Sequence, residues 1–527
     1  MTADEEASAP GQTTSARGDE DARGETSLTS ATISGGAWRT VSVFGGAVMQ
    51  FAVTIVLARI LTPTDFGTFG LVMIVVGLAS MPAFLGLSSA LVQRRSILAV
   101  HVRTAWTLSL ITGVIACAFI ALTAPLLSRL VGDPSTTYVF MAISPAFLLS
   151  GIRTCSVALL RRDLRFRELT IVDVASYSIG YAVVGIAAAL LGWGLWSLVA
   201  ASLCEAAIGT VLSYAYERHS LRLGLSAKAF RQLFGFGGPV SASGVANYVA
   251  LNADNFIIGR VLGPAALGLY ARAYNLMNLP LIYFAGIMGS VLLPAFSRIQ
   301  DDRERMKRSY LVSVYLIFLF SAPTMMFVLI AAPDIIIGIY GHRWTGAIRP
   351  LQVLALFGAL RATYHVGGIL AQGAGRPWSE FARQLMYAGL VAVGALVGTK
   401  WGITGVAWAV GIAIIAMYIA TAQLSRTVTG FGWGDFMSAH RSGAAAGGAV
   451  LLVLSGCRWL LLQTALPALP ALVALVAAFG VTTLAAIATL PKRWGPEGHE
   501  YVLTVACGKL PKPVREIAKR IVLARDA

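Results

Sequence analysis

The most regular feature of the sequence is a succession of long apolar runs separated by short polar or basic links. A helix needs about 20 residues to cross the hydrocarbon core of a bilayer, whereas the strands of a membrane barrel give shorter and weaker apolar segments. The pattern therefore predicts an all-α polytopic membrane protein with about fourteen transmembrane helices. We place them near 38–59, 67–91, 104–127, 137–160, 171–192, 194–215, 236–260, 275–297, 309–331, 347–371, 382–399, 402–424, 443–464 and 468–490. At the shortest links, 192–194 and 400–402, a re-entrant hairpin is the alternative to two crossings.

Basic residues test this helix count independently, because Lys and Arg accumulate in cytoplasmic loops. The links after even-numbered helices hold most of them: Arg94, Arg95, Arg103, Arg161, Arg162, Arg165, Arg167, Arg218, Arg222, Lys228, Arg231, Arg298, Arg303, Arg305, Lys307, Arg308, Arg376, Arg383, Arg426 and Arg441. The links after odd-numbered helices hold fewer: Arg59, Arg129, Arg260, Arg272, Arg343, Arg349 and Lys400. This alternation predicts that both termini are cytoplasmic.

One motif occurs twice, each time between two apolar runs. Residues 57–69 read LARILTPTDFGTF and residues 258–270 read IGRVLGPAALGLY. Five positions match at a constant offset of 201 residues (260 − 59): Arg59 with Arg260, Leu61 with Leu262, Pro63 with Pro264, Gly67 with Gly268 and Phe69 with Tyr270. The alternative is that small-residue membrane hairpins converge by chance. We interpret the motif as a turn between two helices at a membrane face and the chain as two related halves.

The repeat divides the chain into regions. Six helices separate the two copies, so both halves have the same orientation, as in transporters whose two lobes rock about a central site. The predicted N-lobe is 37–220 and the predicted C-lobe is 221–425, while helices 13 and 14 in 426–490 form an appendage. Residues 1–36 read as a disordered acidic cytoplasmic tail without a signal peptide, and 491–527 as a basic amphipathic cytoplasmic tail on the inner leaflet.

Composition agrees with a membrane protein and limits the partners. Hydrophobic residues make up 57% of the chain and charged residues 13%, against about 25% charged in soluble domains. The net charge of +16 is explained by loop topology and by attraction to anionic membrane lipids, so we expect no nucleic-acid partner. The five cysteines have no paired spacing, which indicates neither a disulfide framework nor a metal site.

The helix count, the two lobes and several motifs together resemble a known family. These motifs are GAWR at 36–39, LARILTPTDFG at 57–67, LLRRDLRFR at 159–167, NADNFIIGR at 252–260 and LYARAY at 269–274. The chain resembles the polysaccharide-exporter branch of the MOP superfamily, the Wzx-type flippases that include colanic acid and teichuronic acid exporters. The resemblance covers about residues 35–490. It implies a lipid-linked oligosaccharide on a polyprenyl diphosphate as cargo, a bacterial inner-membrane location, and polysaccharide polymerase or assembly proteins as possible partners.

A diphosphate-linked sugar needs cations and hydroxyl-binding groups, and charges inside a membrane indicate function or internal pairing. The candidate substrate-binding cations are Arg153 in helix 4, and Arg361 and His365 in helix 10, which share a face at i, i+4. Their alternative roles are bracing between helices for the arginines and neutral packing for the histidine. Polar residues of helix 7 complete the predicted substrate site: Asn247, Asn252 and Asn255.

Other charged residues are candidates for gating or coupling. Arg59, Arg260 and Arg272 lie near the predicted outer boundary, where they form a gate or serve as simple interfacial anchors. The acids within or near the spans are Asp173, Glu205 and Asp254, and Asp254 either binds a coupling proton or sodium ion or pairs with an arginine such as Arg260.

The sequence offers little support for catalysis. It lacks a Gly-Lys-Ser/Thr phosphate loop, a His-Glu-x-x-His helix and a Gly-x-Ser-x-Gly elbow. We therefore expect no enzyme activity and no cofactor, with transport driven by a proton or sodium gradient or by cargo removal. The preferred function is a lipid-linked oligosaccharide flippase. The alternatives are a cation-coupled multidrug or metabolite antiporter of the same superfamily and a polytopic membrane glycosyltransferase or ligase.

Overall fold

The computed structural model describes the backbone of residues 45–83, 87–94, 96–464 and 466–489. Within these ranges the side chains of 81–83, 235–244, 246, 247, 250, 281–291 and 377 are not described. The predicted terminal tails, 1–36 and 491–527, and the side chain of Asn247 lie outside the described residues.

Every predicted apolar run corresponds to helical structure in the described residues. The first helix is Gly45–Ile60. The others are α2 (Pro63–Ala83), α3 (Leu87–Gln93), α4 (Ala99–Val131), α5 (Thr136–Ile143), α6 (Pro145–Arg162), α7 (Phe166–Tyr177), the π-helix Ser178–Gly185, α8 (Ile186–Leu190), α9 (Leu195–Tyr216), α10 (Ala227–Val261), α11 (Pro264–Arg298), α12 (Arg303–Ile335), the π-helix Ile336–Tyr340, the 3₁₀ helix His342–Ala347, α13 (Ile348–Gly373), α14 (Pro377–Gly398), the 3₁₀ turn Thr399–Trp401, α15 (Gly402–Thr429), α16 (Trp433–Gln463) and α17 (Ala468–Thr489).

The structure confirms an all-helical membrane fold. Among the described residues, ten stretches are long and apolar enough to cross a membrane, and one of them, Trp378–Thr429, holds both α14 and α15. The predicted count of fourteen crossings stays a prediction, because the first helix, α10 and α11 are not among these ten stretches. Helices α14 and α15 have 22 and 28 residues, so each is long enough to span a bilayer on its own.

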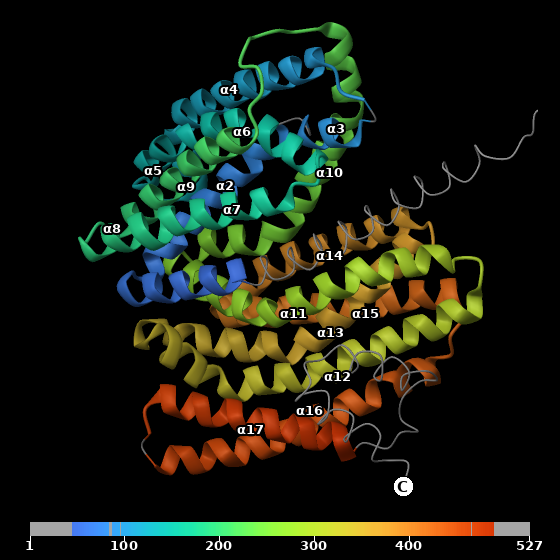
Figure 1. Ribbon diagram of the computed structural model, residues 1–527. Helices are drawn as coiled ribbons and strands as arrows, with labels where there is room; N and C mark the ends of the chain where they lie inside the picture. Colours follow the sequence, from blue (N-terminus) through green and yellow to red (C-terminus); the bar gives the residue numbers. More distant parts are fainter. Residues whose placement is uncertain (1–44, 84–86, 95, 465, 490–527) are drawn as a thin grey trace, which may run out of the picture.

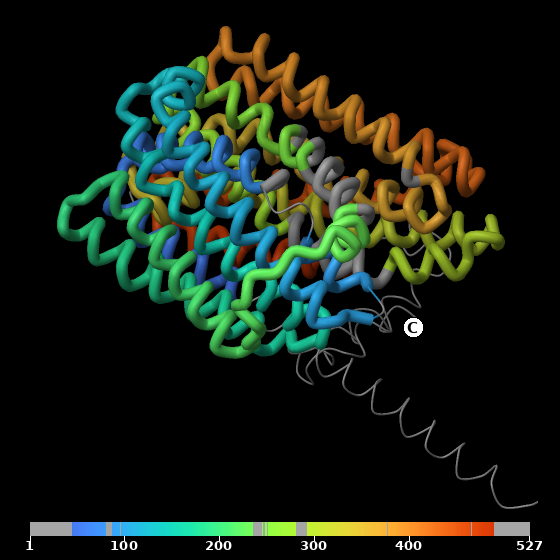
Figure 2. Tube along the Cα trace, turned by 90° about the horizontal axis from the view of Figure 1, so that it is seen from above, coloured from blue at the N-terminus to red at the C-terminus, as the bar shows by residue number. Residues whose placement is uncertain are grey.

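The helices run roughly alongside one another in both views (Figure 1, Figure 2). In Figure 1 helices α4 to α9 gather in the upper part, and α11 to α17 in the middle and lower parts. Helix α2 packs against α11, and α10 contacts α2, α3, α4 and α14, so α10 touches helices of both halves. The two halves therefore meet along α2, α10 and α11.

Several helices differ from their predicted bounds for a local physical reason. Helix α10 begins at Ala227 rather than near 236, because Ser226 accepts a hydrogen bond from the Ala229 amide and caps the added turns. Helix α12 begins at Arg303 in the same way, with Asp302 as its cap. The predicted bounds follow the apolar run, which stops at the first charged residue. The helix itself extends further, because polar residues with good helix propensity continue it beyond the apolar run. The fourth predicted helix is interrupted before Pro145, the first residue of α6.

Helices α16 and α17 pack against α12. Near one end of α16, Arg458 forms an ion pair with Asp334 of α12, with 3.0 Å between Nε and Oδ2. Near the other end, His440 of α16 contacts the hydroxyl of Tyr418 on α15 at 2.8 Å. Helix α16 is thus held near both ends by polar contacts as well as by packing.

Candidate functional site

A polar cavity of about 310 Å³ lies between α2, α6 and α9. We call it the first-half cavity. It is lined by Met73, Val76, Gly77, Ser80, Ala146, Phe147, Ser150, Arg153, Ser202, Glu205, Ala206 and Thr210. Arg153 and Glu205 are the charged residues of this lining, and three serines and a threonine add hydroxyl groups. Such a lining suits a ligand rich in hydroxyl groups.

Arg153 is partly neutralised by its neighbours. Its Nη2 lies 2.7 Å from Oδ1 of Asp173 on α7, and its Nε donates to the Ser213 hydroxyl at 3.1 Å. These contacts join α6 to α7 and α9. The guanidinium therefore braces three helices while it also lines the cavity.

Glu205 is positioned by close contact between α9 and the π-helix Ser178–Gly185. A methyl group at Gly180 would lie 2.8 Å from the Glu205 Cβ, so only glycine allows this approach. Glu205 interacts electrostatically with Arg153 and Asp173. Among the described residues, no hydrogen bond or ion pair occupies its carboxylate, which leaves that group available to a ligand.

A second polar cluster is buried among α10, α11, α13 and α14. Asp254 is 3% exposed; it accepts hydrogen bonds from the Tyr270 hydroxyl at 3.1 Å and from the Asn255 amide at 2.8 Å. Arg361 is 7% exposed and donates to the Tyr387 hydroxyl at 3.1 Å, and its Cζ lies 5.2 Å from the centre of the Tyr274 ring. We call these residues the tyrosine cluster.

The tyrosine cluster corrects one sequence-based interpretation. Asp254 does not pair with Arg260, because the Arg260 guanidinium lies beside Gly132, beyond the end of α4. Arg361 and His365 lie one turn apart on α13 and interact electrostatically, but they differ in exposure: Arg361 is enclosed by tyrosines, whereas His365 is exposed and stacks on Tyr364 with 4.8 Å between ring centres. Arg361 lines none of the described cavities.

The repeated motif forms the contact between the two halves. A methyl group at Gly67 would lie 1.7 Å from the Pro264 carbonyl oxygen, and one at Gly268 would lie 2.0 Å from the Pro63 carbonyl oxygen. Each motif glycine thus packs on the backbone of the other motif's proline. We call this reciprocal contact the motif closure. The turn before α2 is fixed locally, since the Thr62 amide and hydroxyl both donate to Asp65, at 2.9 and 2.7 Å.

Arginines extend the motif closure between the halves. Arg59 donates to the carbonyl oxygens of Gly338 and Ile339, the latter at 2.9 Å, at the end of the helix that continues α12. Arg260 makes the converse contact, from the second half to the end of α4 in the first half. Its Nη1 lies 2.9 Å from the position that a methyl group added at Gly132 would take. The two motif arginines, Arg59 and Arg260, therefore each contact the end of a helix in the other half.

Aromatic side chains fill the space beside these arginines. The Arg272 Cζ lies 4.1 Å from the centre of the Phe66 ring. The buried Trp344 donates from its indole nitrogen to the Ala58 carbonyl at 2.8 Å and lies edge-on to Phe66. The motif closure is therefore a packed, hydrogen-bonded contact.

Comparison with known proteins identifies the family. The polysaccharide biosynthesis protein family matches residues 56–349, which is more than half of the chain. The chain belongs to this family. Two relatives are similar to the chain over most of its length. The lipopolysaccharide biosynthesis protein WzxC of Escherichia coli (strain K12) is 24% identical over 72% of this chain and 78% of its own length. The succinoglycan biosynthesis transport protein ExoT of Rhizobium meliloti (strain 1021) is 29% identical over 69% of this chain and 74% of its own length.

Solved structures show the same fold. A lipid II flippase, MurJ, in an inward closed conformation has a TM-score of 0.66 at 15% identity, covering 85% of this chain and 97% of its own. A multidrug resistance MATE family transporter of the MOP superfamily, in an inward-facing conformation, has a TM-score of 0.60 at 18% identity, covering 73% and 94%. The sequence-based recognition of a polysaccharide-exporter family is confirmed, and the solved structures show that the chain has the fold of these transporters.

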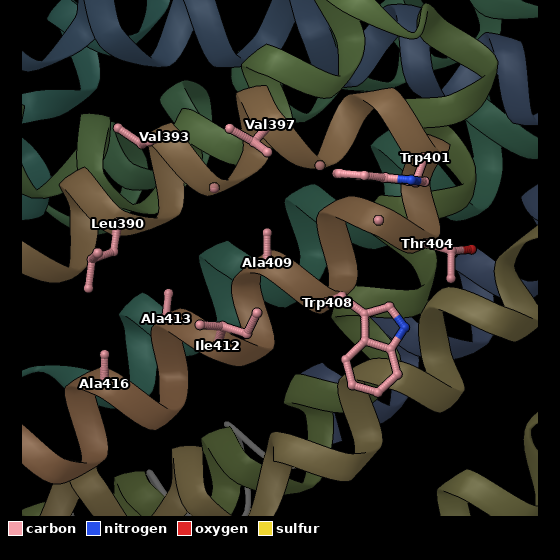
Figure 3. Close-up of a pocket in the computed structure, with 13 residues that line it drawn as sticks. Leu390, Val393, Val397, Trp401, Thr404, Trp408, Ala409, Ile412, Ala413 and Ala416 are labelled. Atoms are coloured by element: carbon pink, nitrogen blue, oxygen red, sulfur yellow. The ribbon is translucent and has the colours of Figure 1, made fainter.

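A larger, apolar cavity of about 610 Å³ lies between α14 and α15 (Figure 3). We call it the apolar groove. Its lining includes Leu390, Val393, Trp401, Trp408 and Ile412, and holds no charged side chain. It differs from the first-half cavity in chemistry and in position.

Sequence reasoning missed several residues of this family member. The tyrosines around Arg361 and the buried Glu380, which accepts from Gln384 at 2.9 Å, carry no sequence signal beyond their place in apolar helices. Gly67 and Gly268, by contrast, did carry a sequence signal, because they occupy matching positions in the repeated motif. Asn252 donates to the Tyr248 carbonyl of its own helix, and the Asn255 side-chain oxygen is buried without a described partner.

Proposed function

We propose that this protein moves a lipid-linked oligosaccharide from the cytoplasmic to the outer leaflet of the bacterial inner membrane. Family membership and the flippase-like fold support this function. The observation that carries it is the motif closure, a contact in which Gly67 and Gly268 bring two repeated turns together. A transporter of two related lobes needs such a contact, which forms on one side of the membrane while the other side admits cargo.

The proposed topology places the motif closure at the outer face. The links after odd-numbered helices, which include both motif turns, are poor in basic residues, whereas the opposite links are rich in them. With both termini cytoplasmic, the conformation described here is closed toward the outside. Cargo would then enter from the cytoplasmic side and leave after the motif closure opens.

The cargo's chemistry agrees with the separation of the cavities. The first-half cavity offers charged and hydroxyl groups for the polar head. The lipid tail stays in the bilayer, where the exposed apolar side chains of helices such as α14 and α15 lie. We propose no catalytic step, because the covalent structure of the cargo is unchanged by movement between leaflets.

Two further parts of the proposal concern energy and partners. Asp254 is a candidate for proton or sodium coupling, because its carboxylate is nearly enclosed and is balanced by hydroxyl and amide donors. The glycan delivered to the outer face is the substrate of a polysaccharide polymerase or assembly protein, which is the class of partner we propose.

Reconstitution tests the function directly. Purified protein is placed in liposomes that carry a polyprenyl-diphosphate oligosaccharide in both leaflets, and an impermeant lectin reports the fraction that becomes accessible from outside. We expect protein-containing liposomes to make the inner-leaflet glycolipid accessible within minutes, and protein-free liposomes to leave it protected. Glycolipid that stays protected, together with gradient-driven efflux of a soluble organic cation, would establish the antiporter alternative instead.

A further inference from the structure

The charges around the first-half cavity indicate which kind of ligand it can hold. Glu205 and Arg153 line this cavity, and Arg153 is paired with Asp173, which lies outside the lining; together these three groups have a formal charge of −1. A diphosphate carries negative charge and would be repelled by this surplus. A sugar hydroxyl, in contrast, donates readily to a carboxylate.

The available hydrogen-bonding groups support the same conclusion. Arg153 already uses Nε for Ser213 and Nη2 for Asp173, so its capacity for a bidentate phosphate contact is reduced. The Thr210 hydroxyl donates to the Ala206 carbonyl at 2.7 Å, with the Leu149 carbonyl at 3.0 Å, and the Ser80 hydroxyl donates to the Gly77 carbonyl at 2.7 Å, which leaves their oxygens as acceptors. The Glu205 carboxylate remains the strongest acceptor without a described partner.

Size and shape limit the ligand further. At about 310 Å³ the cavity lies at the lower end of the range for small-ligand sites, roughly 300–1,000 Å³. It therefore suits one sugar residue rather than a whole oligosaccharide. Met73, Val76 and Phe147 provide an apolar wall for the carbon face of that sugar.

The cavity also touches the other half of the molecule. The Tyr248 hydroxyl of α10 donates to the Met73 carbonyl at 3.2 Å. A methyl group at Gly77 would lie 2.1 Å from the same hydroxyl oxygen, so Tyr248 packs directly on the α2 wall of the cavity. A ligand that displaces this wall would also shift Tyr248 and therefore α10, the helix that contacts both halves.

We infer that the first-half cavity binds one uncharged or amino sugar of the glycan, with the Glu205 carboxylate as its main hydrogen-bond acceptor, and that it disfavours sugar acids. This inference rests on the proposed flippase function. It assigns the specificity of the site to the balance of two carboxylates against one guanidinium.

Three synthetic lipids test it with the purified full-length protein. They are a short-chain polyprenyl diphosphate, the same lipid carrying one neutral hexose, and the same lipid carrying one hexuronic acid. Affinity is measured for each in detergent micelles. We expect the neutral hexose to improve affinity at least fivefold over the bare diphosphate, and the hexuronic acid to give no improvement.

Variants then locate the effect. Glu205→Gln should remove the fivefold gain and retain affinity for the bare diphosphate, and Ser150→Ala, at the cavity wall, should reduce the gain about twofold. Glu304→Gln, at a largely exposed carboxylate on α12, is the matched control and should keep the whole gain. If Glu205→Gln does not fold, Ser150→Ala with the three lipids still decides the question.

The outcomes are distinguishable. A gain that survives Glu205→Gln, or a hexuronic acid that binds as tightly as the neutral hexose, would overturn the assignment while leaving the flippase function intact. Wild-type protein that binds none of the three lipids would instead count against the proposed function.

Discussion

The substitution Gly67→Ala adds one methyl group at the motif closure. That methyl carbon would lie 1.7 Å from the Pro264 carbonyl oxygen, whereas ordinary contact begins at 3.4 Å. The two turns must therefore separate locally by about 1.7 Å, the difference between these two distances. The obstacle is backbone rather than a flexible side chain, so the closed conformation bears most of the strain.

The magnitude follows from this geometry. Overpacking a close contact costs about 1–3 kcal/mol. The gain in helix propensity from glycine to alanine, about 1 kcal/mol, applies equally to the closed and open conformations and cancels from their ratio. At about 2 kcal/mol, the ratio of closed to open protein should fall roughly 30-fold.

Cysteine labelling measures this ratio. The native cysteines are replaced, and Met73→Cys is introduced on α2, about 9 Å along the helix from Gly67 at 1.5 Å per residue. An impermeant maleimide is then added to intact cells. We expect Gly67→Ala to raise the labelling rate about tenfold or more, and to slow glycan movement because the outward-closed state is depopulated.

Gly70→Ala is the matched control. It lies one turn later on the same helix, and its added methyl group would meet only the Leu267 side chain, at 4.0 Å. It should label like the unsubstituted motif. Equal labelling rates for Gly67→Ala and Gly70→Ala would refute the reasoning, because the close backbone contact would then have no energetic consequence.

Three further predictions follow from other contacts. Arg59→Ala removes the hydrogen bonds to two carbonyl groups across the halves and should raise the same labelling rate severalfold, less than Gly67→Ala does; an unchanged rate would show that Arg59 is only an interfacial anchor. Arg361→Met removes the cation that compensates Asp254 and should destabilise the protein by about 1–3 kcal/mol in thermal unfolding, and adding Asp254→Asn should recover most of the loss; a double variant no more stable than the single one would contradict this coupling. Burial lowers the pKa of His219, in the link after α9, below its ordinary value of 6.5, so as the pH falls below about 6.5 the unfolded chain takes up a proton that the folded chain does not. Stability should therefore fall with acidification in that range, and His219→Phe should weaken this dependence in melting curves recorded from pH 7.5 to 5.5; parallel curves for both proteins would contradict it.

The sequence was sufficient to predict the helices because length and hydrophobicity alone decide whether a segment can cross a bilayer. Within the described residues, each predicted apolar run corresponds to helix, even where α5 and α6 divide one run at Pro145. The bounds were less accurate at polar ends such as the start of α10, since capping by Ser226 depends on local geometry rather than on hydrophobicity. The repeated motif was also evident, because it consists of residues with fixed backbone roles.

Only the tertiary structure decided which residues meet. The sequence placed Arg260 near Asp254, but side-chain direction depends on neighbouring helices that are distant in the chain. Packing sent Arg260 toward Gly132 and enclosed Arg361 among tyrosines. It also turned two separate glycines into one reciprocal contact. The hydrophobic pattern determines where each helix lies in the sequence. The cavities and the motif closure depend instead on how the helices fit together in shape and charge.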